Sequence, residues 1–176
     1  MNYADIKYCD VANGEGVRVS LFVSGCTHHC KECFNKEAWD FHYGNLFTQK
    51  EIDRILEYLK PNYIAGLSLL GGEPMEPVNQ EGILPLLRVV KQTYPEKNIW
   101  CYTGYLFDKD VLDKMCKESE VTKEIVSYLD IVVDGEFMID RKNLKINFRG
   151  SDNQRIIDVK KTLDAGEIVH WEREIQ

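Results

Sequence analysis

Positions 18–35 read RVSLFVSGCTHHCKECFN. The first six residues alternate and are rich in β-branched and apolar side chains, which predicts a buried strand over 18–23. Three cysteines follow within eight residues, Cys26, Cys30 and Cys33, with the spacing C-x3-C-x2-C. We call residues 24–35 the cysteine loop. It leaves the carboxyl end of a strand, where α/β folds place their chemistry.

The cysteine spacing suits a metal centre. Three thiolates can ligate three irons of a 4Fe–4S cluster, because such clusters bind soft sulfur ligands. The loop has no fourth cysteine, so one iron would keep an open position for a small molecule, as a catalytic zinc does. A zinc site of Cys3His type, completed by His28, His29 or His42, is the alternative. A disulfide has less support, since no secretion signal accompanies it.

A second segment with chemical potential follows the strand predicted over 64–70. It reads Gly71-Gly72-Glu73-Pro74. Glycines allow the backbone to approach a ligand closely because no Cβ intervenes, and Glu73 offers an acceptor for an ammonium group. Glycine and proline also suit a plain strand-to-helix turn, so this segment alone leaves both interpretations open.

The composition excludes several classes of function. Of 176 residues, 44% are apolar and 29% charged, as in ordinary globular domains, and the length predicts one domain over 1–176. The net charge of −7 argues against a nucleic-acid partner, which would need a basic patch. No signal-peptide core lies within 1–10, and no apolar run approaches the roughly 20 residues of a membrane span. We therefore expect a cytoplasmic protein, in which six cysteines favour metal binding over disulfides.

The remaining periodicity predicts an α/β fold. Strands are expected over 3–8, 18–23, 64–70, 98–102, 130–133, 144–148 and 168–171, helices over 48–60, 81–94, 108–118 and 121–129, and either state over 155–165. Alternating strands and helices imply right-handed βαβ units and a mostly parallel sheet. The other cysteines, Cys9, Cys101 and Cys116, read as packing or edge residues.

The triple-cysteine motif after a first strand, with Gly71-Gly72-Glu73-Pro74 after a later one, resembles the radical S-adenosylmethionine (SAM) superfamily. The chain is also similar, more narrowly, to the activating proteins of anaerobic ribonucleoside-triphosphate reductase. The narrower similarity rests on CFN at 33–35 with Trp39, WCYTGY at 100–105, DGEF at 134–137 and FRGSDNQR at 148–155. The matching motifs run from about position 13 to 159, nearly the whole chain.

This resemblance implies a fold, a reaction and partners. The fold would be a partial, open (β/α) barrel forming a single radical SAM domain over 1–176. The enzyme would be a radical SAM oxidoreductase whose reduced 4Fe–4S cluster cleaves SAM to methionine and a 5′-deoxyadenosyl radical. That radical would generate the glycyl radical of the reductase, with flavodoxin or ferredoxin as electron donor.

The resemblance also implies roles for named residues. Cys26, Cys30 and Cys33 would ligate the cluster, with SAM on the fourth iron, and Gly71, Gly72 and Glu73 would bind the methionyl end of SAM. Many superfamily members carry an adenine-packing aromatic residue just before the third cysteine, where this chain has Glu32. Phe34 or backbone groups would then contact adenine. The expected cofactor-binding residues are Glu32, Cys33, Phe34, Gly71, Gly72, Glu73, Thr103 and Asp134, and Arg149 and Asn153 are candidates for the SAM or partner side.

Three other functions compete with this one. The chain could activate a different glycyl-radical enzyme, of the pyruvate formate-lyase type, or act on a small molecule as a radical SAM enzyme. It could also be a zinc-binding interaction protein without catalysis. Iron content after anaerobic reconstitution separates the zinc protein from the others, since a cysteine-ligated cluster holds about four irons.

Overall fold

The computed structural model describes residues 1–172, and its centre is a seven-stranded sheet of order β3-β1-β2-β4-β5-β6-β7. The strands are β1 Asn2–Asp10, β2 Val17–Val23, β3 Asn45–Leu46, β4 Ile64–Gly71, β5 Asn98–Tyr102, β6 Ile131–Asp134 and β7 Arg155–Asp158. Strands β2, β4, β5 and β6 are parallel neighbours, whereas β1, β3 and β7 pair antiparallel at the two edges. The α/β class is confirmed, with a mixed sheet that does not close.

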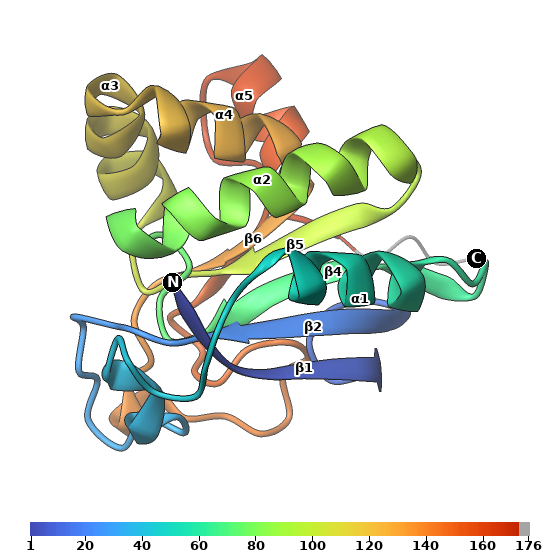
Figure 1. Cartoon of the computed structure of the whole chain (residues 1–176). Coiled ribbons are helices and arrows are strands. Elements are labelled where there is room, and N and C mark those ends of the chain that lie inside the picture. Colours follow the sequence, from blue (N-terminus) through green and yellow to red (C-terminus); the bar gives the residue numbers. More distant parts are fainter. Residues whose placement is uncertain (173–176) are drawn as a thin grey trace.

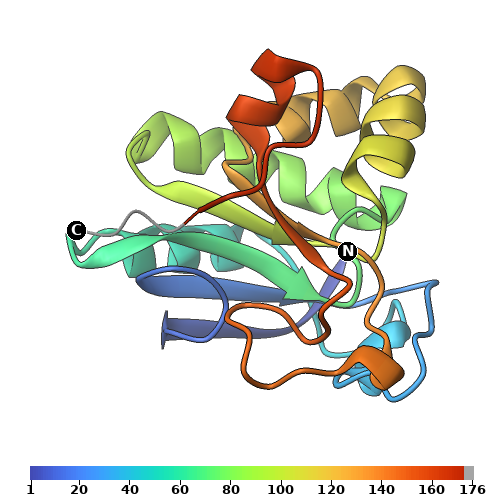
Figure 2. The ribbon, with the colours of Figure 1, turned by 180° about the vertical axis from the view of Figure 1, so that it is seen from behind.

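The helices lie on one face of this sheet, as both ribbon views show (Figure 1, Figure 2). They are α1 Gln49–Leu59, α2 Pro77–Thr93, α3 Cys116–Glu118, α4 Glu120–Tyr128 and α5 Val159–Ala165. A π-helical stretch spans Phe107–Met115, and short 3-10 helices span Lys36–Trp39 and Ile139–Arg141. The segment after β6 lies on the other side, next to the cysteine loop (Figure 2).

Helix α1 follows directly from its sequence. Thr48 and Glu51 form a capping box, in which each side chain accepts a hydrogen bond from the backbone N–H of the other residue. The apolar residues Ile52, Ile55 and Leu59 recur at helical spacing and are all buried. Local capping and packing therefore agree, and the predicted helix is confirmed.

Strand β2 is buried on both faces. Val19, Leu21 and Val23 point into the main core beneath the helices. Arg18, at the start of the strand, is also fully buried, and its guanidinium carbon lies 5.4 Å from the centre of the Trp100 ring on the opposite face. The strand that carries the cysteine loop is thus held from both sides.

The predicted strand over 144–148 is wrong. This segment is an irregular loop closed by one bridge between Lys142 and Ser151. Leu144 is 83% exposed, and Phe148 has a φ of +60°, which a strand does not tolerate. The alternating apolar residues Leu144, Ile146 and Phe148 line a cavity that is described below. Their period of two therefore arises without strand pairing.

Four other segments add to the comparison of the predicted elements with the structure. The predicted strand over 168–171 is reduced to one bridge between His170 and Ile157. Helix α2 begins at Pro77, before the predicted start at 81, and Pro85 lies inside the helix. Residues 155–165 hold both states, because the Asp158 side chain accepts a hydrogen bond from Lys161 N and starts α5 after β7. The two-residue strand β3 was not predicted, since so short a segment carries no periodicity.

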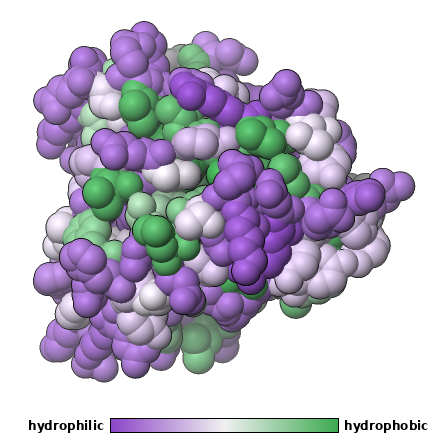
Figure 3. All heavy atoms as spheres, viewed as in Figure 1, coloured by the Kyte–Doolittle hydropathy of each residue, from purple (hydrophilic) through white to green (hydrophobic). Residues whose placement is uncertain are grey.

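The next feature is the distribution of apolar residues in the helices and on the surface. Within residues 1–172, none of them combines the length and apolar content that a membrane crossing needs. On the face seen in Figure 1, hydrophobic side chains form small separate groups among hydrophilic ones (Figure 3). This face presents no continuous apolar surface.

Asp130, immediately before β6, is hydrogen-bonded to residues of α2, β5 and α5. Its Oδ2 accepts hydrogen bonds from Lys91 Nζ at 3.0 Å and from the backbone N of Ile99 at 2.8 Å, and Lys160 Nζ donates to Oδ1 at 2.6 Å. Burial alone would raise the pKa of Asp130, but these donors outweigh it and hold the pKa below its ordinary value. Such a carboxylate stabilises the fold above its unfolded pKa and stops doing so as the pH falls through its folded pKa.

We therefore expect Asp130→Asn to lower the free energy of unfolding at neutral pH. The difference from wild type should shrink as the pH drops below about 4, because the Asp130 carboxyl of the unfolded chain is protonated first and that of the folded chain follows at lower pH. Urea unfolding at several pH values measures this difference. Asp113→Asn, at an exposed pair with Lys117, is the matched control and should change little. A difference that stays constant down to pH ~3 would contradict the prediction.

Candidate functional site

A cavity of about 510 Å³ opens at the carboxyl ends of the parallel strands. The loops after β2, β4, β5 and β6 all contribute to its wall, as expected for an α/β sheet. Its polar and metal-ligating lining includes Cys26, Cys30, Cys33, Gly71, Gly72, Glu73, Thr103, Gly104 and Gly135. The fold therefore brings the two sequence motifs to one place.

The three thiols of the cysteine loop line this cavity. Cys26 is buried, Cys30 and Cys33 are half-buried, and none of them is in a disulfide. Burial raises the pKa of Cys26 to about 11 and also raises the pKa of Cys30, so both sulfurs are protonated in the metal-free chain. A bound metal would displace these protons.

The thiols share the cavity without forming a finished ligand set. Within the described part of the chain, no group of three or more His, Cys, Asp and Glu side chains is arranged to hold a metal ion. The chemistry of the donors still fits a cluster, since three soft sulfurs face one space.

The glycine segment is pressed against the cysteine loop. Gly72 N donates to Val23 O at 2.7 Å, and Glu73 N donates to Gly25 O at 2.8 Å. A Cβ on Gly72 would lie 2.6 Å from Gly25 O and 2.9 Å from Ala38 O, and Gly71 has a φ of +108°. The glycines are therefore required by the chain's own backbone, because a side chain would push the two loops apart.

We expect Gly72→Ala to destabilise the protein by roughly 1–3 kcal/mol, the usual cost of forcing a methyl group into packed backbone. Thermal unfolding measures the loss, and iron retention after reconstitution should fall with it. The control is Gly82→Ala in α2, where the nearest atoms belong to the flexible Met1 side chain. That change should be neutral or stabilising, since alanine favours a helix. Equal stability of the two variants would contradict the prediction.

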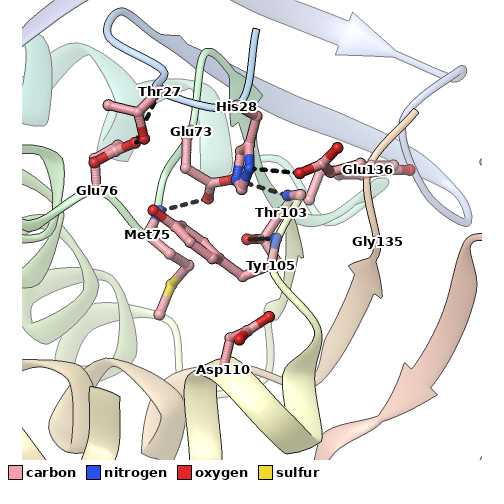
Figure 4. A network of polar contacts seen from close by, with 12 residues as sticks. Thr27, His28, Glu73, Met75, Glu76, Thr103, Tyr105, Asp110, Gly135 and Glu136 are labelled. Carbon is pink, nitrogen blue, oxygen red and sulfur yellow. Dashed lines mark hydrogen bonds and ion pairs between the residues drawn. The ribbon is translucent and has the colours of Figure 1, made fainter. Parts of the chain in front are cut away.

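Glu73 is buried at the centre of a polar network (Figure 4). Its Oε1 accepts from Met75 N at 2.8 Å, and its Oε2 accepts from Gly104 N at 2.7 Å. The Nε2 of His28 lies 2.9 Å from the same Oε2, and the Nδ1 of His28 lies 3.3 Å from Glu136 Oε1. His28, a possible ligand in the alternative zinc site, thus has a carboxylate contact at each ring nitrogen.

The charge state of His28 follows from these contacts. Burial alone would lower the pKa of His28, but the hydrogen bond and charge of Glu73, together with Glu136, outweigh it and raise the pKa above its ordinary value. The carboxylate of Glu73 thus faces a cationic partner when His28 is protonated.

The other expected residues separate into two groups. Thr103 lines the cavity, and its Oγ1 accepts from Tyr105 N at 3.1 Å. Phe34 also lines it, although it is 64% exposed, and its ring lies 5.0 Å from that of Phe137. Glu32 lies outside the lining and pairs with Lys36 at 3.5 Å on the surface.

Asp134 also lies outside the cavity lining. It is fully buried, and its carboxylate accepts from Phe107 N and pairs with Arg155. The next residue, Gly135, forms the wall in its place. Asn153 is also outside the cavity lining, and its Nδ2 donates to Glu136 O at 2.9 Å.

Further residues of the lining were not expected from the sequence. They include Tyr102, Phe137, Leu144, Ile146, Phe148 and Gln154. Within residues 1–172, three buried polar atoms of the wall lack a hydrogen-bond partner, namely Trp39 Nε1, Tyr102 Oη and Arg149 Nε. The motif at 100–105 contained Tyr102, the motif at 134–137 contained Phe137, and the motif at 148–155 contained Phe148 and Gln154, whereas Leu144 and Ile146 lay outside these motifs.

Comparison with known proteins defines the class. Residues 12–157 match the family model described as 4Fe-4S single cluster domain. This is a family of iron–sulfur proteins, in agreement with the three thiols that share the cavity.

Curated relatives narrow the class further, and each is named anaerobic ribonucleoside-triphosphate reductase-activating protein. The protein of Enterobacteria phage T4 is 44% identical over 158 residues, covering 89% of this chain and 93% of that protein. The Haemophilus influenzae protein is 42% identical over 158 residues, with 89% and 97% coverage. The Escherichia coli K12 protein is 38% identical over 156 residues, with 88% and 96% coverage. The chain belongs to this family of reductase-activating proteins, which confirms the narrower resemblance seen in the motifs.

Proposed function

We propose that this chain is a radical SAM oxidoreductase that activates an anaerobic ribonucleoside-triphosphate reductase by generating its glycyl radical. The proposal takes residues 1–176 as a single radical SAM domain, with the open sheet as part of a (β/α) barrel, acting in the cytoplasm. One observation carries the proposal: the cysteine loop and the glycine segment line the same cavity, and Glu73 N donates a hydrogen bond to Gly25 O.

In this proposal Cys26, Cys30 and Cys33 hold a 4Fe–4S cluster and SAM occupies the fourth iron. When bound and reduced, the cluster supplies the electron that cleaves SAM to methionine and a 5′-deoxyadenosyl radical, which then takes a hydrogen atom from a glycine of the reductase. The protein contributes binding, orientation and exclusion of water.

The remaining lining divides between the two ends of SAM. Gly71, Gly72 and Glu73 receive the methionyl end, since all three line the cavity together with the cysteines. Cys33, Phe34 and Thr103 also line the cavity and are assigned to the adenosyl side. Glu32 and Asp134, outside the lining, are left without a direct contact to SAM.

The three unpartnered polar atoms of the wall support a polar ligand. Buried donors without a partner are costly, so Trp39, Tyr102 and Arg149 gain if a ligand supplies acceptors. A molecule with a carboxylate, a ribose and a base offers several such acceptors.

The partners follow from the reaction. A reductase segment that carries the target glycine must reach the cavity, and an external one-electron donor, flavodoxin or ferredoxin, must reduce the cluster. No nucleic acid or membrane takes part.

The deciding experiment is anaerobic. The reconstituted and reduced protein is mixed with SAM and an anaerobic ribonucleotide reductase, and the same tube is analysed by EPR and for 5′-deoxyadenosine. A glycyl-radical doublet with deoxyadenosine is the expected result. Deoxyadenosine without the doublet would point to another glycyl-radical enzyme or a small-molecule substrate. Neither product, from protein with a full cluster, would overturn the enzymatic proposal.

The zinc-binding alternative has less support from the contacts of the histidines. Both ring nitrogens of His28 are taken by Glu73 and Glu136. His29 stacks on Trp39 at 4.6 Å, and the His42 side chain is 92% exposed beside Asp40. A fourth zinc ligand would therefore need one of these contacts to break or a loop to move.

A further inference from the structure

His28 joins the cysteine loop to three other parts of the cavity wall. Its ring nitrogens contact Glu73, after β4, and Glu136, after β6. The ring also packs edge-on against Tyr105, after β5, with the ring centres 4.4 Å apart. The side chain is only 10% exposed. Figure 4 shows these groups converging on the imidazole from separate strand ends.

Gly104 limits where this ring can go. A Cβ on Gly104 would lie 2.6 Å from His28 Cδ2, so the backbone and the imidazole are in direct contact. Gly104 N also donates to the same Glu73 oxygen that His28 contacts. A carboxylate has about four lone-pair positions, and contacts to Met75 N, Gly104 N and His28 occupy most of those of Glu73. These contacts connect the loops that follow β2, β4 and β5.

His28 also lies two residues from each of the first two cysteines of the loop, Cys26 and Cys30. The contacts of its ring hold the backbone at His28, and a shift of that backbone would move both cysteines, because only one residue separates His28 from each of them. We infer that His28 is a positioning residue, which fixes the cysteine loop against Glu73 and Glu136 and so sets the place of the cluster relative to the methionyl end of SAM. The inference rests on the proposed function.

The test compares His28→Ala and His28→Gln with wild type after anaerobic reconstitution. All three cysteines remain, so iron content should not change. The dissociation constant for SAM should rise about 10–100-fold in His28→Ala, as for residues that orient the ligands of a metal site. The change that SAM causes in the EPR spectrum of the reduced cluster should be lost in parallel. His28→Gln should restore most of the affinity, because its amide can donate to Glu73.

His29→Ala is the matched control. His29 is the next residue, is exposed and has a positive φ of 51°, and its ring stacks on Trp39 without an ion pair to the described residues. Its removal should leave both the SAM affinity and the EPR response near wild type. A general disturbance of the loop would affect both histidine variants alike, and that result would overturn the inference.

The other outcomes are also decisive. Unchanged SAM affinity in His28→Ala would overturn the inference, and so would loss of iron, since His28 would then act on cluster formation and not on its placement. If His28→Ala does not fold, Glu136→Gln takes its place, because Glu136 is 57% exposed. That variant should weaken SAM binding in the same direction, and an unchanged affinity would overturn the inference. Failure of the wild-type protein to bind SAM would instead defeat the proposed function.

Discussion

Cys30→Ala should leave the reconstituted protein without its iron, whereas wild type should hold about four irons per chain. Cys30 is the middle cysteine of the loop and lines the cavity together with Cys26 and Cys33. A cluster with only two protein ligands would lack the anchoring that three thiolates provide. Iron analysis and the visible absorption of the anaerobic protein measure the effect.

Cys101→Ala is the matched control for this prediction. Cys101 is almost fully buried in β5 and packs in the main core, away from the cavity lining. Its iron content should equal that of wild type, although the lost sulfur can lower stability slightly. Full iron retention by Cys30→Ala would rule out the loop as the ligand set. Stoichiometric zinc in place of iron would favour the zinc-binding protein.

Arg18→Met should cause a large loss of stability, although Arg18 lies outside the cavity lining. Arg18 is fully buried. Its Nε donates to Ser68 Oγ at 2.7 Å, its Nη1 to Asn98 Oδ1 at 2.7 Å, and its Nη2 to Leu67 O at 2.9 Å. Burial lowers the pKa of Arg18 to about 10, so the side chain is still charged at neutral pH.

Methionine would fill much of the same space but would donate no hydrogen bond. Several buried acceptors would then lose their partners at once, which should cost about 3 kcal/mol or more. Urea unfolding followed by circular dichroism measures this loss. The matched control is Arg88→Met, because Arg88 is largely exposed and pairs with Glu124 on the surface. Its effect should be small. A similar stability of the two variants would show that the buried guanidinium is not required.

Several features of this protein were predictable from the sequence because they depend on neighbours along the chain. The strand at 18–23 and the capped helix after Thr48 follow from alternation, helical spacing and a local capping box. The cysteine spacing and the later motifs were enough to indicate an iron–sulfur protein of the reductase-activating family, which the comparisons confirm. Their positions after strands also predicted that they would meet at one edge of the sheet.

The apolar alternation over 144–148 misled for a physical reason. A period of two shows only that alternate side chains share one environment, and a strand also needs a partner to satisfy its backbone. Here Ile146 and Phe148 turn toward the cavity while the backbone folds back on itself between Lys142 and Ser151. Whether a neighbouring strand is present is a property of the assembled sheet.

The sequence by itself determined the central strands and the helices between them, the cysteine loop and the family. Only the tertiary structure decided what each polar side chain contacts. His28 meets Glu73 across 45 residues of chain, and Arg18 meets Ser68 across 50. Asp134, which the motif suggested for the cofactor, is held by Arg155 instead. Such pairs are set by how the sheet and its loops pack, and buried polar groups must find partners wherever packing brings them.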